Sequence, residues 1–243
     1  MQPDASAAAK ATPVQSRLIL ALDVDDLVDA VRLGTVLRPY FGVAKVGLEL
    51  FSAVGPDAIP ALLNLGYEVF VDLKLHDIPT TVAKAARVLG ALGVSYLTFH
   101  ARGGVTMLRA GVEGLSEGAL NAGLEPPVAL AITVLTSDDD APPHIVPDRV
   151  RLADQAGCGG IVCAAADAAL AASLAPRLLR VVPGIRPAGG ETHDQARVAT
   201  PAQAFADGAD LLVIGRAVSA APNPAAAAEA LLGELLAGGA PRP

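Results

Sequence analysis

The chain has 243 residues, of which 52% are hydrophobic and 18% are charged, a composition far from that of a disordered protein and sufficient for a large core. Its net charge of −7 and its pI near 5.0 speak against a nucleic acid or an anionic membrane surface as partner. The apolar runs are all too short to span a membrane.

The two ends of the chain differ in composition from the rest. Residues 1–16 are rich in Ala, Ser, Pro and Gln without a continuous apolar core, so they predict a disordered leader and no secretory signal. Residues 236–243 predict a disordered tail, and residues 17–235 a single domain. Cys158 and Cys163 are the only cysteines, and Cys163 lies in an apolar strand pattern. Buried thiols in a reducing cytoplasm are therefore expected rather than a disulfide.

Eight short apolar runs alternate with Ala- and Leu-rich segments of helical spacing. The predicted strands are Leu18–Leu22, Val43–Leu48, Val69–Leu73, Tyr96–Phe99, Val128–Leu135, Ile161–Cys163, Val181–Val182 with an extension to Ile185, and Leu211–Ile214. Helical spacing is found, for example, at residues 27–37, 58–65, 82–89 and 170–178. This alternation is typical of a parallel sheet covered on both faces. Eight units in about 225 residues favour a closed (β/α)8 TIM barrel. An open doubly wound sheet is the alternative, but Asp23-Val24-Asp25-Asp26 stands where its Gly-rich loop would follow the first strand.

Polar residues stand at or near the ends of most of these strands. They are Asp23, Lys45, Asp72, Lys74, His100, Thr136, Ser137, Arg186, Gly215 and Arg216. Active sites of (β/α)8 barrels lie at the C-terminal ends of the strands, where the fold would gather these distant residues. The sequence therefore predicts an enzyme.

The segment Asp72–Thr81 carries the most specific signal. It follows the apolar residues Val69-Phe70-Val71, so its charges begin where a buried strand ends and Coulomb interactions are strong. Asp72 and Lys74 are two residues apart, so both side chains leave the same face of an extended strand. Only four of the 18 basic residues are lysines, and two of them, Lys45 and Lys74, lie in predicted strands. An ammonium can give up its proton, which a guanidinium cannot do.

Other candidates have two interpretations each. Gly215-Arg216 predicts an anion site after the last strand, or a structural turn. The loop 183–191 is either a lid or an ordinary loop. Asp23 is either an acceptor for a sugar hydroxyl or a helix N-cap, and Asp25 or Asp26 could cap equally well, which favours the first. His100 is expected to be structural rather than catalytic, and the three carboxylates 138–140 are expected to be solvated or helix-capping rather than metal-binding. No spacing of His and Cys predicts a zinc site.

These residues resemble the orotidine 5′-phosphate decarboxylase family, from Arg17 to Gly233. The matching motifs, in the family's order, are Leu20-Ala21-Leu22-Asp23, Lys45-Val46-Gly47, Asp72-Leu73-Lys74-Leu75-His76-Asp77-Ile78-Pro79, Val134-Leu135-Thr136-Ser137, Pro183-Gly184-Ile185-Arg186, Asp194-Gln195 and Ile214-Gly215-Arg216. Leu75 stands where the family usually has an aromatic residue, which is a change in packing.

The resemblance implies a role for each matching residue. Lys74 is similar to the proton donor to C6 of the pyrimidine, and Asp72 to the carboxylate facing the substrate's own carboxylate. Asp77 resembles a residue contributed across a homodimer interface, with Ile78 and Thr81 beside it. The remaining expected contacts are Asp23 and Lys45 with the ribose, Thr136 and Ser137 with the pyrimidine, and Arg186, Gln195, Gly215 and Arg216 with the phosphate and lid. The family uses no metal and no organic cofactor.

The implied activity is decarboxylation of orotidine 5′-phosphate to UMP, the last step of de novo pyrimidine nucleotide synthesis. The charges of Lys45, Asp72, Lys74 and Asp77 alternate in sign, which would keep each group ionised near the reacting carbon. One alternative is a metal-dependent barrel that acts on sugar phosphates, such as hexulose-phosphate synthase or keto-gulonate-phosphate decarboxylase. Those relatives need a metal-binding carboxylate near the second strand, where this chain has Lys45. The other alternative is a non-catalytic nucleotide-binding barrel.

Overall fold

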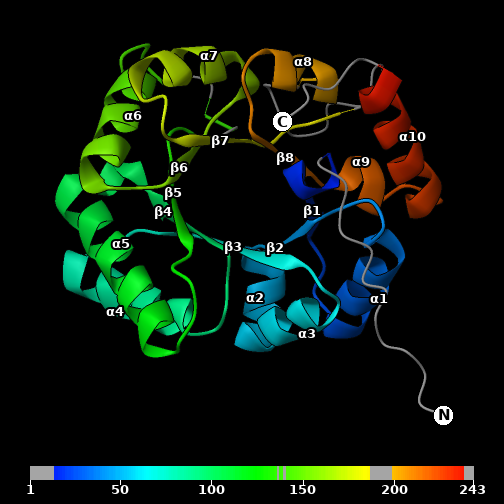
Figure 1. Cartoon of the computed structure of the whole chain (residues 1–243), viewed down its shortest axis with the longest axis horizontal. Coiled ribbons are helices and arrows are strands. Elements are labelled where there is room, and N and C mark those ends of the chain that lie inside the picture. Colours follow the sequence, from blue (N-terminus) through cyan, green and yellow to red (C-terminus); the bar gives the residue numbers. More distant parts are fainter. Residues whose placement is uncertain (1–13, 136, 139–140, 187–198, 238–243) are drawn as a thin grey trace.

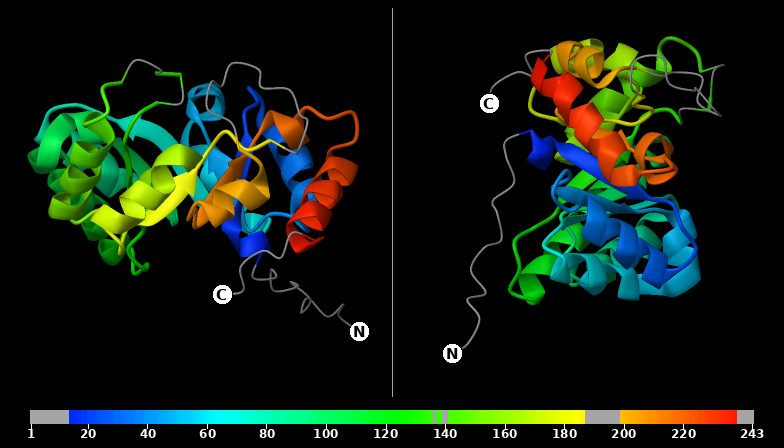
Figure 2. Two further views of the ribbon diagram at one scale, coloured as in Figure 1. Left: turned by 90° about the horizontal axis from the view of Figure 1, so that it is seen from above. Right: turned by 90° about the vertical axis from the view of Figure 1, so that its right-hand side faces the viewer.

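The computed structural model describes residues 14–135, 137–138, 141–186 and 199–237. Eight parallel strands form one closed barrel in chain order, and the pairing of β1 with β8 closes it. Helices surround the strands as an outer layer (Figures 1 and 2). The predicted (β/α)8 barrel is confirmed, and the open sheet is excluded.

The strands follow the predicted order. They are β1 (Leu18–Leu22), β2 (Val43–Val46), β3 (Glu68–Leu75), β4 (Tyr96–His100), β5 (Val128–Ile132), β6 (Gly160–Val162), β7 (Leu179–Val182) and β8 (Leu211–Ile214). β2 is shorter than predicted because Leu48, which is 56% exposed, begins a helix after Gly47. β5 ends three residues earlier than predicted, at Ile132, whereas β3 continues to Leu75.

The helices fill the connections between the strands. They are α1 (Leu27–Leu37), α2 (Leu48–Val54), α3 (Ala58–Asn64), α4 (Pro79–Gly90), α5 (Gly104–Asn121), α6 (Ile145–Ala156), α7 (Ala165–Leu174), α8 (Pro201–Ala206), α9 (Arg216–Ser219) and α10 (Pro224–Ala237). Short 3-10 helices are η1 (Gln15–Arg17), η2 (Gly55–Asp57) and η3 (Ala101–Gly103). The described residues start at Val14, which packs against the core, so residues 14–16 of the expected leader are part of the described fold.

Two apolar layers explain the nearly continuous apolar strands. Alternate residues, such as Ile19 and Ala21 of β1, point into the barrel and pack there with Phe70 and Leu130. The intervening residues point outward and pack against the helices, as Leu20 does. A strand buried on both faces has no polar side, which is why period-2 alternation is missing from the sequence.

The helices α4 and α5 approach each other closely through glycines. A Cβ at Gly90 of α4 would lie 2.2 Å from the carbonyl oxygen of Leu115 in α5. Cβ atoms at Gly114 and Gly118 of α5 would lie 2.3 Å and 1.9 Å from backbone carbonyl oxygens of α4. These separations are far below contact distance, so only glycine allows the two backbones to pack this way.

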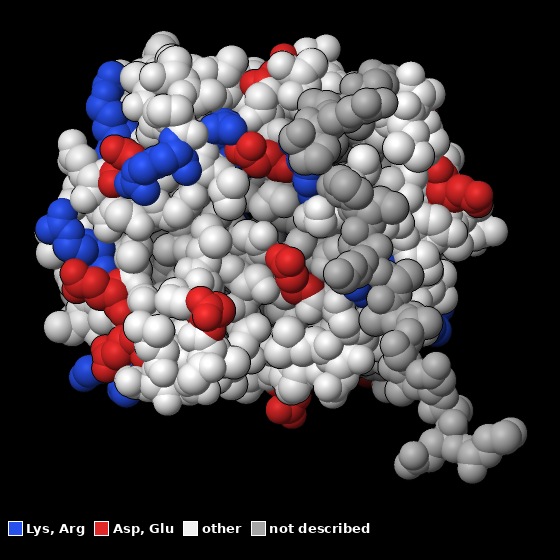
Figure 3. Space-filling model, viewed as in Figure 1, with Lys and Arg blue, Asp and Glu red and all other residues white. Residues whose placement is uncertain are grey.

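Some charged side chains on the outer surface form ion pairs. Arg151 contacts Asp148 at 3.2 Å within α6, and Arg177 contacts Asp154 at 2.6 Å. On the face drawn in Figure 3, Lys and Arg side chains along the edge formed by α5–α7 lie next to Asp and Glu side chains. Within the described part of the chain, no helix is both long and apolar enough to cross a membrane.

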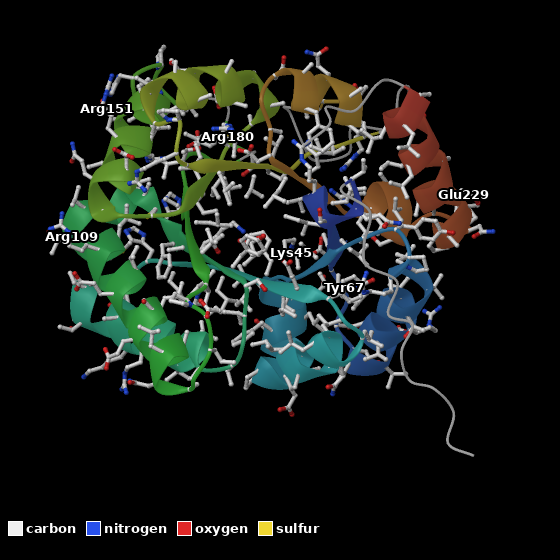
Figure 4. The ribbon with its side chains drawn as sticks, viewed as in Figure 1. Lys45, Tyr67, Arg109, Arg151, Arg180 and Glu229 are labelled. Atoms are coloured by element: carbon white, nitrogen blue, oxygen red, sulfur yellow. The ribbon has the colours of Figure 1, made fainter. Side chains whose placement is uncertain are left out.

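A network of ion pairs and hydrogen bonds lies at the N-terminal ends of the strands. Arg180 of β7 contacts Asp210, which precedes β8, at 2.7 Å, and donates to the carbonyl oxygens of Gly208 and Leu178. Arg17 donates to the carbonyl oxygens of Asp210 and Ala209. Figure 4 shows Arg180 on β7 and Lys45 near the middle of the barrel.

Candidate active site

A pocket of about 240 Å³ opens at the C-terminal ends of the strands. Its charged lining residues are Asp23, Lys45, Asp72, Lys74, Arg186 and Arg216. They lie in β2 and β3 or shortly after the ends of β1, β7 and β8. The barrel thus gathers residues that are up to 193 positions apart, as Asp23 and Arg216 are. It brings these six residues together in one pocket, and their role in a site stays a prediction.

Three of these residues form the start of a row of charges. Lys45 points into the barrel, and its side chain is only 10% exposed. Its Nζ lies 3.1 Å from Oδ1 of Asp23 and 3.8 Å from Oδ2 of Asp72. Two carboxylates on either side of a nearly buried ammonium offset much of the cost of removing its charge from water.

Lys74 continues the row. Its Nζ donates to both carboxylate oxygens of Asp72, at 3.0 Å and 2.9 Å, so the ammonium is held against one acid by two hydrogen bonds. The third N–H of this ammonium has no acceptor among the residues that the structure describes. The Lys74 side chain is 31% exposed and the Asp72 side chain 13% exposed, both in the pocket. A partly desolvated ammonium with one spare N–H can donate a proton or a hydrogen bond to a bound molecule.

Gly47 gives this row the room it needs. A Cβ at this position would lie 2.9 Å from Nζ of Lys45 and 3.2 Å from Oδ1 of Asp23. Any larger residue would therefore push the ammonium away from its partner. The role of Asp23 is also clarified, because the N-cap of α1 is Asp26, whose Oδ1 accepts the N–H of Asp29 at 3.0 Å. The carboxylate of Asp23 is thus not used as a helix cap.

The structure does not bring Asp77 into the row within one chain. Asp77, Ile78 and Thr81 are exposed, at the loop that precedes α4 and in its first turn, and Ile78 is 63% exposed. Oδ1 of Asp77 accepts the N–H of the next residue at 2.6 Å. The row within a single chain is therefore Asp23, Lys45, Asp72 and Lys74, with the sign alternating from one end to the other.

Another part of the pocket lining consists of residues that are expected to bind an anion. Gly215 directly follows β8, and Arg216 begins α9. Arg186, which is 6% exposed, follows β7, and its backbone N–H donates to the carbonyl oxygen of Ala199. Ser137 also lines the pocket. Thr136 and Gln195, which the sequence analysis assigned to the same site, lie outside the described residues.

His100 ends β4 and caps the short helix η3. Its Nδ1 accepts the backbone N–H of Arg102, which caps η3, and its ring lies 5.6 Å from that of the exposed His76. Burial, followed by the positive charge of Arg149, lowers the pKa of His100. A neutral imidazole is what an acceptor at Nδ1 requires.

Neither thiol is poised for chemistry, and the described residues form no cluster suited to a metal ion. Cys158 and Cys163 are both free and buried, as expected. Burial raises the pKa of each to about 12, so the Cys163 thiol stays protonated although it lines the pocket. Among the described residues, no group of three or more His, Cys, Asp and Glu side chains could hold a metal ion.

The apolar lining of the pocket and the buried Thr98 were not predicted as parts of the site. Phe70, Val162 and Val213 give the pocket its apolar lining, and they are inward-facing strand residues. Thr98 of β4 is fully buried and contacts both Asp72 and Lys74. The sequence places Thr98 on the same strand face as His100, but it does not show which residues of β3 the threonine contacts.

Comparisons with known proteins agree on one family. A family model described as the orotidine 5′-phosphate decarboxylase / HUMPS family matches residues 16–231. A protein from Anaeromyxobacter sp. (strain K) named orotidine 5′-phosphate decarboxylase is 48% identical over 226 residues, which cover 88% of this chain and 96% of that protein. A protein of the same name from Moorella thermoacetica is 44% identical, over 91% of this chain and 92% of its own length.

A solved structure supports the same assignment. The crystal structure of orotidine 5′-phosphate decarboxylase from Lactobacillus acidophilus is similar with a TM-score of 0.75 and 34% identity, covering 90% of this chain and 98% of that chain. The fold, the pocket and the matching segments of sequence thus lead to one conclusion. The chain belongs to the orotidine 5′-phosphate decarboxylase / HUMPS family.

Proposed function

We propose that the protein decarboxylates orotidine 5′-phosphate to UMP and CO₂ without a metal or organic cofactor, as the last step of de novo pyrimidine nucleotide synthesis. The names of its relatives support this reaction. The observation that carries it is the ammonium of Lys74, held by both oxygens of Asp72 inside the pocket.

The chemistry requires a charge that is in place before the bond breaks. Cleavage of the bond between C6 and the carboxylate releases CO₂ and leaves the electron pair on C6, in the plane of the ring. Lys74 stabilises that developing charge without reorganisation and then transfers a proton from Nζ to C6. The neutral amine regains its proton from solvent. Repulsion between Asp72 and the substrate's carboxylate is assigned a smaller part.

The other residues bind the parts of the substrate that do not react. We assign Asp23 and Lys45 to the ribose hydroxyls, Thr136 and Ser137 to the pyrimidine, and Arg186, Gln195, Gly215 and Arg216 to the phosphate and the closing loop. Binding energy from the phosphate, remote from C6, can be used to stabilise the transition state.

The active site is proposed to be shared between two copies of the chain. Asp77, Ile78 and Thr81 are exposed in the single chain, and an exposed isoleucine beside a carboxylate is a reasonable contact for a partner subunit. Asp77 of one subunit would then complete the row beyond Lys74 of the other. The buried free thiols are compatible with a reducing cytoplasm, which we propose as the compartment.

Mixing two inactive variants tests the shared site. Homodimers of Asp77→Ala and of Lys74→Ala should each have very low activity, whereas mixed dimers contain one site with both residues intact. Activity should therefore recover when the two variants are unfolded and refolded together. If no activity returns although mixed dimers form, Asp77 does not act across an interface.

One assay separates the proposed reaction from its alternatives. Purified, chelator-treated protein should convert orotidine 5′-phosphate to UMP, measured as the loss of substrate absorbance. Activity that disappears with the chelator and returns with a divalent metal would favour a metal-dependent sugar-phosphate enzyme. Binding of UMP without turnover of orotidine 5′-phosphate would favour a non-catalytic barrel.

A further inference from the structure

Thr98 is a buried polar residue beneath the row of charges. It lies on β4, is 0% exposed, and shares the inward face of that strand with Tyr96. It is not among the described residues that line the pocket. A threonine in this position cannot meet a bound molecule directly, so any effect on chemistry must pass through the groups that it contacts.

Its hydroxyl joins the two central residues of the site. Oγ1 accepts the backbone N–H of Lys74 at 2.9 Å and lies 2.9 Å from Oδ1 of Asp72. A backbone N–H can only donate, and an ionised carboxylate can only accept. The hydroxyl hydrogen must therefore point to Asp72. The hydroxyl oxygen of Thr98 thus orients the Asp72 carboxylate and also fixes the backbone of Lys74, whose ammonium that carboxylate binds.

The backbone at Lys74 needs such a support. Lys74 has φ +52°, and it is the only residue other than glycine with a positive φ in the described part of the chain. The pairing of β3 with β4 shifts there, from Val71 opposite Leu97 to Leu75 opposite Phe99. Four steps along β3 thus match two steps along β4, which is an irregularity of the bulge type. Bulges redirect side chains and interrupt the ladder, and the left-handed conformation is unfavourable for lysine.

We propose that Thr98 is a positioning residue of the active site, whose hydroxyl sets the place of the Lys74 ammonium by holding the bulge and the Asp72 carboxylate together. The proposal rests on the proposed function for its kinetic consequence, but the geometry of Lys74 can be measured separately. The Thr98 hydroxyl accepts the Lys74 N–H in place of a strand carbonyl oxygen. It also restrains the Asp72 carboxylate, to which Nζ of Lys74 donates.

The chain offers a matched control for the loss of a buried hydroxyl. Thr133 is also 0% exposed, and its Oγ1 donates to the carbonyl oxygen of Val162 at 2.8 Å. That bond joins the end of β5 to β6 and contacts none of the row. Thr133→Val therefore removes the same group from the same kind of environment without touching Lys74 or Asp72.

The kinetic experiment compares Thr98→Val, Thr98→Ser and Thr133→Val. Thr98→Val should lower kcat roughly 10–100-fold, about 1.4–2.8 kcal/mol of activation free energy. UMP should bind to it nearly as well as to the wild type, because the ribose and phosphate contacts are unchanged. Thr98→Ser keeps the hydroxyl and should retain most of kcat, and Thr133→Val should retain kcat per folded site. The proposal is overturned if Thr98→Val keeps its kcat, if Thr98→Ser loses as much, or if Thr133→Val matches the loss.

A spectroscopic readout does not depend on turnover. The chain has four lysines, so NMR of ¹³C-lysine-labelled protein gives few signals, and Lys→Arg variants assign them. Thr98→Val should shift the Cε signal of Lys74 and leave that of Lys84 in place, whereas Thr98→Ser should leave both. An unmoved Lys74 signal overturns the proposal whatever the substrate is. A shifted signal in a protein that does not decarboxylate orotidine 5′-phosphate refutes the proposed function alone. Thr98→Ala replaces Thr98→Val in both experiments if the latter does not fold.

Discussion

The two ends of the barrel hold ion networks that use their basic residues differently. At the N-terminal end, every side-chain nitrogen of Arg180 has an acceptor, because Nε and Nη1 donate to carbonyl oxygens and Nη2 contacts Asp210. At the C-terminal end, Lys74 donates twice to Asp72 and keeps one N–H without an acceptor among the described residues. All three nitrogens of Arg180 thus contact acceptors of the protein, whereas Lys74 lines the pocket, where its third N–H can meet a ligand.

The choice of basic residue follows from this difference. The planar guanidinium of arginine can satisfy several fixed acceptors at once and does not release its proton. The ammonium of lysine is a compact charge that can be exchanged for a neutral amine. An arginine is thus suited to joining β7 and β8, and a lysine to a site where a proton is transferred. The comparison predicts that removing the basic side chain lowers mainly activity at Lys74 and mainly stability at Arg180.

The largest effect is expected at Lys74. Lys74→Ala should reduce kcat by roughly 10⁴-fold or more, because it removes both the charge that stabilises the carbanion and the proton donor. Lys74→Arg should fail similarly, since a guanidinium cannot supply the proton. UMP binding, measured by calorimetry, should largely survive in both. A kcat near that of the wild type in either variant would remove Lys74 as the general acid.

A smaller effect on activity is expected at the phosphate end of the pocket. Arg216→Ala should lower kcat/KM for orotidine 5′-phosphate by roughly 10–100-fold, because a charge-assisted contact to the phosphate is lost. Added phosphite dianion should partly restore turnover of the truncated nucleoside substrate in the wild type, and less so in the variant. Arg151→Ala, in the exposed pair with Asp148, serves as the control. An unchanged kcat/KM for Arg216→Ala would mean that the phosphate binds elsewhere.

The smallest effect on activity, but a clear effect on stability, is expected at Arg180. Arg180→Met should lower the free energy of unfolding by about 1.5–3 kcal/mol, since the Asp210 carboxylate and two carbonyl oxygens lose a charged donor. The kcat per folded site should not change. Urea denaturation with Arg151→Met as control measures this, because an exposed pair contributes only about 0–1 kcal/mol. Loss of kcat without loss of stability would contradict the division between the two ends.

Much of the fold follows from the sequence because its signals are local. The strands are short apolar runs, and helices such as α1 and α4 are amphipathic segments, so their order, and hence the closed barrel, could be predicted. Boundaries failed where the tertiary structure decides them. Leu48 continues an apolar run but begins α2, and β3 continues through Lys74 because β4 pairs again at Leu75.

The site divides in the same way. Lys45, Asp72 and Lys74 could be predicted because each lies at or near the C-terminal end of a strand, and such ends meet in a barrel. The contribution of Thr98 could not, since it depends on the shift in pairing between β3 and β4. The need for glycine at position 47 also depends on where the Lys45 ammonium lies.

The contact between the backbones of α4 and α5 has a consequence for the proposed dimer. α4 begins at Pro79, two residues after Asp77. Glycines allow its backbone to pack directly against that of α5, which restrains movement of α4. In the proposed dimer, the loop before α4 would present the Asp77 carboxylate to the other subunit from a closely packed helix pair. If the site is shared as proposed, a bulky residue at Gly114 or Gly118 would displace α4 in one subunit and lower the activity of the site in the other subunit.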